Sequence, residues 1–231
     1  MTADGLGDLV ADIATCRRCP RLVEWREQVA RTRVARHRDS VYWGRPVPGF
    51  GDSTARLLLV GLAPAAHGAN RTGRVFTGDN AGGSGELLFE ALHSAGYSPR
   101  PRSVAPADGL QLQDAYIAAV NRCAPPANKP TTEERDACLP FLVRELRLLR
   151  SVTIILALGS YAWKAVLRVL AKMGHRSTPA PRFGHAAEAR MGPYTLLGCY
   201  HPSQQNTFTG RLTIEMVEDV LHRARALSES G

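Results

Sequence analysis

The chain has 231 residues, of which 44% are hydrophobic, and its 29 Lys and Arg against 21 Asp and Glu leave a net charge of +8. This length and apolar content predict one domain spanning residues 1–231, and the lack of any apolar run of roughly 18 residues excludes a membrane-spanning helix. The basic excess is mostly arginine, which favours DNA or another phosphate-bearing partner, although Arg-rich chains are also common in GC-rich genomes.

Strands and helices alternate along the predicted secondary structure. Short apolar runs typical of buried strands lie at 56–62, 116–121, 152–158 and 194–200. Helical spacing of apolar residues predicts helices over 85–95, 132–149, 160–173 and 213–227. The segments without periodicity, expected to be loops, are 31–52, 98–108 and 174–190. Such alternation predicts an α/β fold: a single-domain, three-layer αβα arrangement with a central, mostly parallel four-stranded sheet.

Two of the predicted helices begin with capping signals. Thr131, with Glu134 three residues later, has the pattern of a capping box, and Ser160 is placed to cap the next helix. In a sheet of parallel strands, ligands bind outside the carboxyl ends of the strands. We therefore expect the loops after residues 62, 121, 158 and 200 to share one rim.

The sequence contains five cysteines. Met1–Val10 carries acids where a secretory signal has basic and then apolar residues, so we expect a cytoplasmic protein with reduced thiols. A C-x2-C pair and two later cysteines could close one four-thiolate site, made of Cys16, Cys19, Cys123 and Cys138. Structural zinc and a [4Fe–4S] cluster both fit this donor set, and unconnected thiols are the remaining alternative. Cys199 lies within an apolar strand and is expected to be a core residue.

Polar and aromatic side chains follow three of the predicted strands. GLAPAAHGANRTGRVFTGD, residues 61–79, lacks both the Gly-Lys-Ser/Thr of a phosphate loop and the G-x-G-x-x-G of a dinucleotide site. NRCAPPANKP spans 121–130, and YHPSQQNTFTGR spans 200–211. Together they supply imidazole, amide, aromatic, guanidinium and carboxylate groups. On one rim, these groups suit a flat heteroaromatic ring whose face is stacked and whose edge is hydrogen-bonded.

These three motifs, with the four-cysteine pattern, resemble the type 5 (B-type) uracil-DNA glycosylases, which contain an iron–sulfur cluster. The similarity extends from TCRRCP, residues 15–20, to the last helix. It implies hydrolysis of the N-glycosidic bond of a damaged base in DNA, single- or double-stranded, by a protein expected to be a monomer. It also implies that Cys16, Cys19, Cys123 and Cys138 hold a structural [4Fe–4S] cluster, with zinc as the less favoured occupant.

The resemblance assigns roles to individual residues. Phe76 would stack on the extruded base, Asn128 would bond its edge, and His201 would donate to a base oxygen as charge develops. Asp79 would orient or deprotonate water, because Ala63 stands where type 1 enzymes carry an aspartate. Gly61, Ala63 and His67 would also bind the substrate, and His67 is a weaker alternative to Asp79 for contacting water, or could contact phosphate.

Specificity and DNA contacts follow from the same comparison. Ala119 stands where type 1 and type 4 enzymes tend to place a uracil-reading asparagine, so we expect hypoxanthine and xanthine to be accepted beside uracil. The phosphate contacts expected from the loops are Arg71, Arg74, Lys129, Arg211 and the segment 31–45. Gln204 and Gln205 are the candidates that fill the space left by the extruded base.

Two other functions remain open from the sequence. One is a non-catalytic protein of the same superfamily that binds damaged or single-stranded DNA. The other is a small-molecule hydrolase with zinc on the four cysteines.

Overall fold

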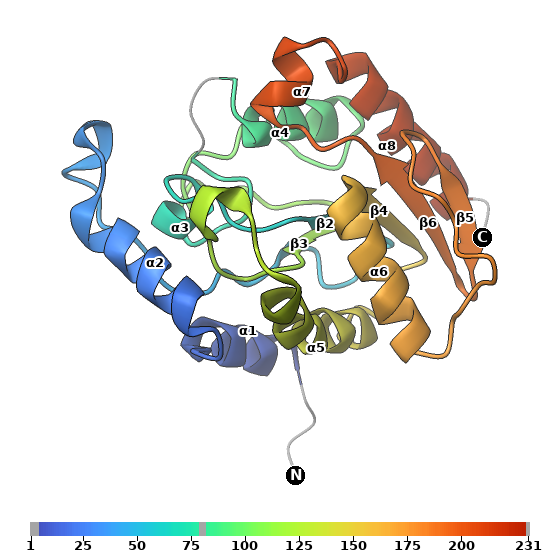
Figure 1. The fold of residues 1–231 in the computed structure, drawn as a ribbon. Helices are drawn as coiled ribbons and strands as arrows, with labels where there is room; N and C mark the ends of the chain where they lie inside the picture. The colour runs from blue at the N-terminus through green and yellow to red at the C-terminus, as the bar shows by residue number, and fades with distance from the viewer. Residues whose placement is uncertain (1–4, 79–81, 230–231) are drawn as a thin grey trace.

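A central sheet of six strands, ordered β1-β3-β2-β4-β6-β5, organises the computed structural model (Figure 1). The structure describes residues 5–78 and 82–229. The strands are β1 (Phe50–Gly51), β2 (Leu57–Gly61), β3 (Ala115–Ala119), β4 (Ile154–Leu158), β5 (Glu188–Met191) and β6 (Tyr194–Cys199). The four inner strands are parallel, and the two edge strands pair antiparallel with their neighbours. The α/β class is confirmed, but the expected number of strands is corrected from four to six.

The edge strands escaped prediction because they lack the apolar runs of the inner strands. β1 has two residues, and β5 is largely exposed or half-buried along EARM. They lie within or at the end of segments 31–52 and 174–190, which were expected to be loops. The inner strands β2, β3 and β4 are buried along their whole length, because helices cover both faces of the sheet.

The helices lie on the two faces of the sheet and around its rim (Figure 1). They are α1 (Leu6–Thr15), α2 (Pro20–Thr32), α3 (Ala69–Thr72), α4 (Ser84–Ser94), α5 (Thr132–Leu148), α6 (Ser160–Lys172), α7 (Gln204–Phe208) and α8 (Ile214–Glu229). The helices α4 and α8 pack together over one face, and α5 and α6 cover the other. None of the helices in the described ranges is long and apolar enough to cross a membrane.

The two predicted caps have different outcomes. The capping box is confirmed: Glu134 N donates to Thr131 Oγ1 at 3.2 Å, and Thr131 N donates to the Glu134 carboxylate at 2.8 Å. The cap at Ser160 is wrong, because Gly159 is the N-cap of α6 and has φ of +94°. A Cβ at Gly159 would lie 3.2 Å from the Cβ of His201. The glycine therefore allows β4 to pass closely beside the residue that follows β6.

Helices α1 and α2 place the amino-terminal cysteines against the rest of the molecule. Cys16 is the C-cap of α1, and Cys19 is the N-cap of α2. Leu9 and Ile13 of α1 are buried against Cys138 and Phe141 of α5. Packing of α1 on α5 thus brings the C-x2-C pair to the helix that carries Cys138.

Candidate active site and cysteine cluster

A cavity of about 610 Å³ opens at the carboxyl ends of β2 and β3. Its wall comes from the segments after β2, β3 and β6 and from the start of α4. The residues that line it are Gly61, Leu62, Ala63, Pro64, Ala65, Ala69, Val75, Phe76, Gly83, Ser84, Ala119, Ala127, Asn128, His201, Ser203, Gln204 and Gln205. The expected shared rim is therefore formed by three of the four loops, while Gly159 after β4 lies beside His201.

Phe76 presents its ring to the cavity from a strained backbone. Its φ is +53°, a left-handed conformation that costs a bulky residue about 1–3 kcal/mol. The ring lies against Gly61, where a Cβ would approach it to 2.9 Å. The ring centroids of Phe76 and His201 are 6.3 Å apart. A glycine at the end of β2 thus leaves room for an aromatic platform beside an imidazole.

His201 lies beside this platform and is held there by its own loop. Asn206 Nδ2 donates to the carbonyl oxygen of His201 at 2.8 Å. Burial lowers the pKa of His201 to about 4. The ring is therefore neutral at pH 7, with one N–H donor and one acceptor nitrogen. Such a ring can donate to a developing anion without carrying a charge of its own.

Asn128 reaches the cavity from a turn with two consecutive left-handed residues. Ala127 has φ of +51° and Asn128 has φ of +57°. Asparagine tolerates this region better than most residues, whereas alanine does not. Asn128 is exposed, and it lines the same cavity as Phe76 and His201.

The glutamines and the serine of the last motif form the outer part of the wall. Ser203 is the N-cap of α7 and accepts a hydrogen bond from Asn206 N at 3.4 Å. Gln204 and Gln205 begin this short helix and are exposed. Sequence reasoning missed the capping role of Ser203 and the contribution of Ser84, although a serine after glycines is a common signal of a helix start.

His67 and Asp79, both predicted to belong to the site, have different outcomes. His67 is not among the lining residues, and its Nδ1 lies 3.1 Å from the hydroxyl of Tyr42. Burial, followed by the charges of Arg36 and Arg71, lowers the pKa of His67. Asp79 lies outside the described residues.

The arginines predicted to hold DNA differ in their surroundings. Arg211 is exposed, with its guanidinium 4.7 Å from the centre of the Tyr200 ring. Arg71 is half-buried and donates to the carbonyl oxygens of His67 and Gly78, at 2.9 and 2.6 Å. Arg74 is buried and paired with Asp108 at 2.6 Å, so its guanidinium faces the protein. The predicted phosphate contact of Arg74 stays a prediction, and the contacts of its guanidinium that the structure shows are with the protein itself.

The four cysteines of the predicted site lie in one region. Neighbouring thiols of this set contribute to raising the pKa of Cys19, Cys123 and Cys138, so these groups lie close together. Burial raises the pKa of Cys123 to about 12. Within the described ranges, however, no set of three or more Cys, His, Asp or Glu side chains converges as the ligands of one metal ion would. Cys199 is buried in the core, as expected.

A buried guanidinium lies against this group of thiols. Arg26 of α2 is 2% exposed, and its Nη1 donates to Cys123 Sγ at 2.9 Å. Its Nη2 donates to the Cys16 carbonyl oxygen at 3.2 Å. The nearest carboxylate is Glu27 at 3.9 Å, which also pairs with Arg17. A buried cation with so little compensation fits a neighbouring centre of negative charge, such as metal-bound thiolates.

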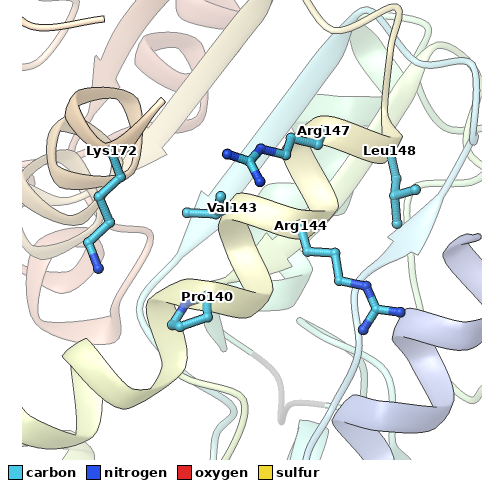
Figure 2. A pocket seen from close by; sticks show the side chains of 6 residues that line it. All are labelled: Pro140, Val143, Arg144, Arg147, Leu148 and Lys172. Atoms are coloured by element: carbon cyan, nitrogen blue, oxygen red, sulfur yellow. The ribbon is translucent and has the colours of Figure 1, made fainter. Parts of the chain in front are cut away.

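A second hollow, of about 470 Å³, lies along α5 (Figure 2). Lys172 of α6 and Arg144 and Arg147 of α5 flank aliphatic side chains there, and Arg144 points toward α1 and pairs with Asp12. This hollow has no aromatic ring or amide in its wall. It therefore lacks the groups that recognise the face and edge of a heteroaromatic ring, which the first cavity has.

Comparison with known proteins gives one consistent result. The family model described as the uracil DNA glycosylase superfamily matches residues 48–225. A type-5 uracil-DNA glycosylase of Mycobacterium tuberculosis is 52% identical over 228 residues, covering 98% of this chain and 83% of the relative. The type-5 enzyme of Thermus thermophilus is 50% identical over 220 residues, covering 95% and 96%. A type-4 uracil-DNA glycosylase of Archaeoglobus fulgidus is 31% identical over 160 residues, covering 69% and 62%.

Proposed function

The chain belongs to the uracil DNA glycosylase superfamily, and we propose that it hydrolyses the bond between uracil and deoxyribose in DNA, leaving an abasic site. The observation that carries this proposal is the meeting of Phe76, Asn128 and His201 at one cavity. These residues come from three distant segments of the chain. Their groups offer one aromatic face and two hydrogen-bonding edges, which are the requirements for gripping a single base.

Catalysis begins with extrusion of the base into the cavity, because its glycosidic bond cannot be reached inside the duplex. Phe76 stacks on the ring, and the Asn128 amide bonds its edge. As the bond breaks, negative charge grows on the base and positive charge on the sugar. The neutral imidazole of His201 donates to the base oxygen that gains charge, in a site where burial strengthens the interaction.

The water that attacks the sugar needs a carboxylate. Ala63, which lines the cavity, offers only a methyl group. We therefore propose that the Asp79 carboxylate orients or deprotonates the water. The same carboxylate would stabilise the positive charge that develops on the sugar. The preceding Gly78 is held on both sides, since its carbonyl oxygen accepts from Arg71 at 2.6 Å and its N–H donates to Ser103 at 3.1 Å.

Acceptance of other deaminated bases rests on Ala119. This residue lines the cavity at the end of β3 and has no group that could select one hydrogen-bonding edge. Asn121, two residues later, is buried and its Oδ1 accepts from the Tyr161 hydroxyl at 2.7 Å. Because Ala119 cannot select for the hydrogen-bonding edge of uracil, we propose that hypoxanthine and xanthine are excised as well.

We further propose that Cys16, Cys19, Cys123 and Cys138 hold a structural [4Fe–4S] cluster. The neighbouring thiols and the buried cation of Arg26 support a metal–thiolate centre of negative charge. The resemblance to the type 5 enzymes favours the cluster over zinc as its occupant. When bound, it would cross-link α1 and α2 to α5 and to the loop after β3.

DNA would be gripped beside the cavity by exposed basic and polar groups. Arg211, Lys129 and the segment 31–45 offer phosphate contacts, while Gln204 and Gln205 stand at the mouth to fill the vacated space. Arg71 would contact phosphate from the loop after β2, where it donates to the carbonyl oxygens of His67 and Gly78. We propose a cytoplasmic monomer that accepts both single- and double-stranded DNA.

Release of free uracil from a labelled oligonucleotide tests the proposed function. The wild-type protein should release uracil, and His201→Ala and Asp79→Ala should slow release by about 10²–10³-fold while still binding the oligonucleotide. A wild-type protein that binds uracil-containing DNA without releasing the base would instead be a non-catalytic member of the superfamily. Oligonucleotides carrying hypoxanthine or xanthine, in single and double strands, then establish the substrate range.

A further inference from the structure

The backbone around Phe76 is held by hydrogen bonds that close across it. Phe76 has φ of +53°, so its ring would leave the cavity if the backbone relaxed to an ordinary conformation. Thr77 is fully buried, and its hydroxyl donates to the Val75 carbonyl oxygen at 3.1 Å. Arg74 Nε donates to the same hydroxyl at 3.0 Å. Residues on either side of Phe76 are thus tied to each other.

This arrangement is anchored to a distant part of the chain through Arg74. Its Nη2 donates to Asp108 at 2.6 Å and to Ser103 Oγ at 2.7 Å. Ser103 Oγ also lies 2.5 Å from the Thr77 hydroxyl. Arg74 stacks over the Phe50 ring at 5.1 Å. The side chain therefore joins the Phe76 turn to the loop between α4 and β3.

Asp108 is the organising residue of that loop. Its carboxylate accepts from the backbone N–H groups of Val104, Ala105 and Leu110, at 2.9, 3.2 and 3.0 Å. Burial alone would raise the pKa of Asp108, but the hydrogen bonds from Arg74 and the backbone lower it well below its usual value. Asp108 is thus a fixed anion, and the buried Arg74 side chain, 7% exposed, has a half-buried partner of opposite charge.

We infer that Arg74, fixed by Asp108, is the positioning residue that holds the Phe76 ring in the base cavity. Arg74 touches neither the base nor the phosphates. It acts through Thr77, whose hydroxyl closes the turn around Phe76. This inference rests on the proposed function of Phe76 as the stacking platform, and it gives a basic residue of the glycosylase motif a role other than gripping DNA.

Inhibition by free uracil tests the inference, because the free base reports on the cavity without any phosphate contact. Thr77→Val removes the hydroxyl at nearly constant volume, whereas Thr77→Ser keeps it. We expect the inhibition constant of uracil to rise about tenfold or more in Thr77→Val, Arg74→Gln and Asp108→Asn, and to stay near the wild-type value in Thr77→Ser. Arg102→Gln is the control, since Arg102 lies in the same loop, is exposed and pairs only loosely with Glu86 at 3.7 Å.

Two further readouts separate positioning from other roles. The double variant Arg74→Gln/Asp108→Asn should raise the inhibition constant of uracil no further than either single change, because both changes break the same Arg74–Asp108 pair. In Arg74→Gln, the dependence of the oligonucleotide KM on salt concentration should be the same as in the wild type. Loss of a phosphate contact would instead reduce the slope of log KM against log salt by about 1. If Arg74→Gln fails to fold, the pair Thr77→Val and Thr77→Ser carries the test alone.

The outcomes are distinct. Unchanged uracil inhibition in folded Thr77→Val overturns the inference, and so does a reduced salt slope in Arg74→Gln with unchanged uracil inhibition. A wild-type protein that releases no uracil overturns the proposed function instead. If the wild type releases uracil and the variants have the same inhibition constant for free uracil as the wild type, the inference fails and the proposed function stands.

Discussion

His201 shows how the fold sets the chemistry of a single residue. Its neutral ring follows from burial, and that burial also makes stability depend on pH. The folded pKa of about 4 lies below the ordinary value of 6.5, so the unfolded chain takes up the proton first as the pH falls. Stability from this residue is complete above pH 6.5, declines below it, and is fully lost below about pH 4.

We therefore predict that His201→Gln flattens the pH dependence of unfolding. Between pH 7 and pH 4.5, the wild type should lose about 2 kcal/mol more unfolding free energy than the variant. Urea unfolding at a series of pH values measures this difference. Parallel curves for the two proteins would mean that the imidazole is already solvated in the folded state.

Gly159 positions the same histidine from the neighbouring strand. Gly159→Ala should destabilise the protein by about 1–3 kcal/mol, because φ is +94°, and should also slow uracil release, because the new Cβ meets His201. Gly174→Ala is the matched control: φ is +92° there, but nothing lies within 4 Å of the added Cβ. The control should lose stability and keep its activity. Equal activity losses in both variants would contradict a specific effect on His201.

Single residues also mark where sequence reasoning reached its limit. The rim was predictable, because parallel strands fix where their following loops lie. The buried position of Arg74 was not, since its partner Asp108 is 34 residues away and no local pattern connects them. The left-handed turn at Asn128 was equally hidden, because the preceding Ala127 disfavours it.

At the scale of elements, the strength of the apolar pattern decided what could be predicted. The four inner strands are runs of buried residues, whereas β1 and β5 have no such run and were missed. The helix α1 carried a usable signal, because Leu6, Leu9 and Ile13 have helical spacing. No helix was nevertheless predicted there.

The start of α5 offers a test of a predicted element. Thr131→Ala should lower the free energy of unfolding by about 1 kcal/mol, because the N–H of Glu134 loses its acceptor at the helix start. Thr132→Ala, one residue along and exposed, should change stability by less than half of this. Urea midpoints of the two variants give the comparison. A larger loss in Thr132→Ala would show that the capping box is not what begins α5.

For the whole molecule, the cysteine region connects the amino-terminal helices to the α/β body. Arg26 is the group that compensates negative charge there, so Arg26→Gln should reduce the iron bound per chain and the absorbance near 400 nm. Arg17→Gln is the control, because Arg17 is 63% exposed and pairs with Glu27. Metal analysis of the purified proteins provides the readout. Full iron content in Arg26→Gln would contradict the role of this cation, and zinc in the wild type would contradict the cluster.

The central claim is that three distant segments meet at one cavity, where the glycosidic bond is broken. Single-turnover release of uracil at saturating enzyme tests it most directly for Phe76→Ala, Asn128→Ala and His201→Ala. Each should slow the bond-breaking step by about tenfold or more, while Arg147→Gln in the hollow along α5 should leave the rate unchanged. Wild-type rates in all three cavity variants would contradict the claim.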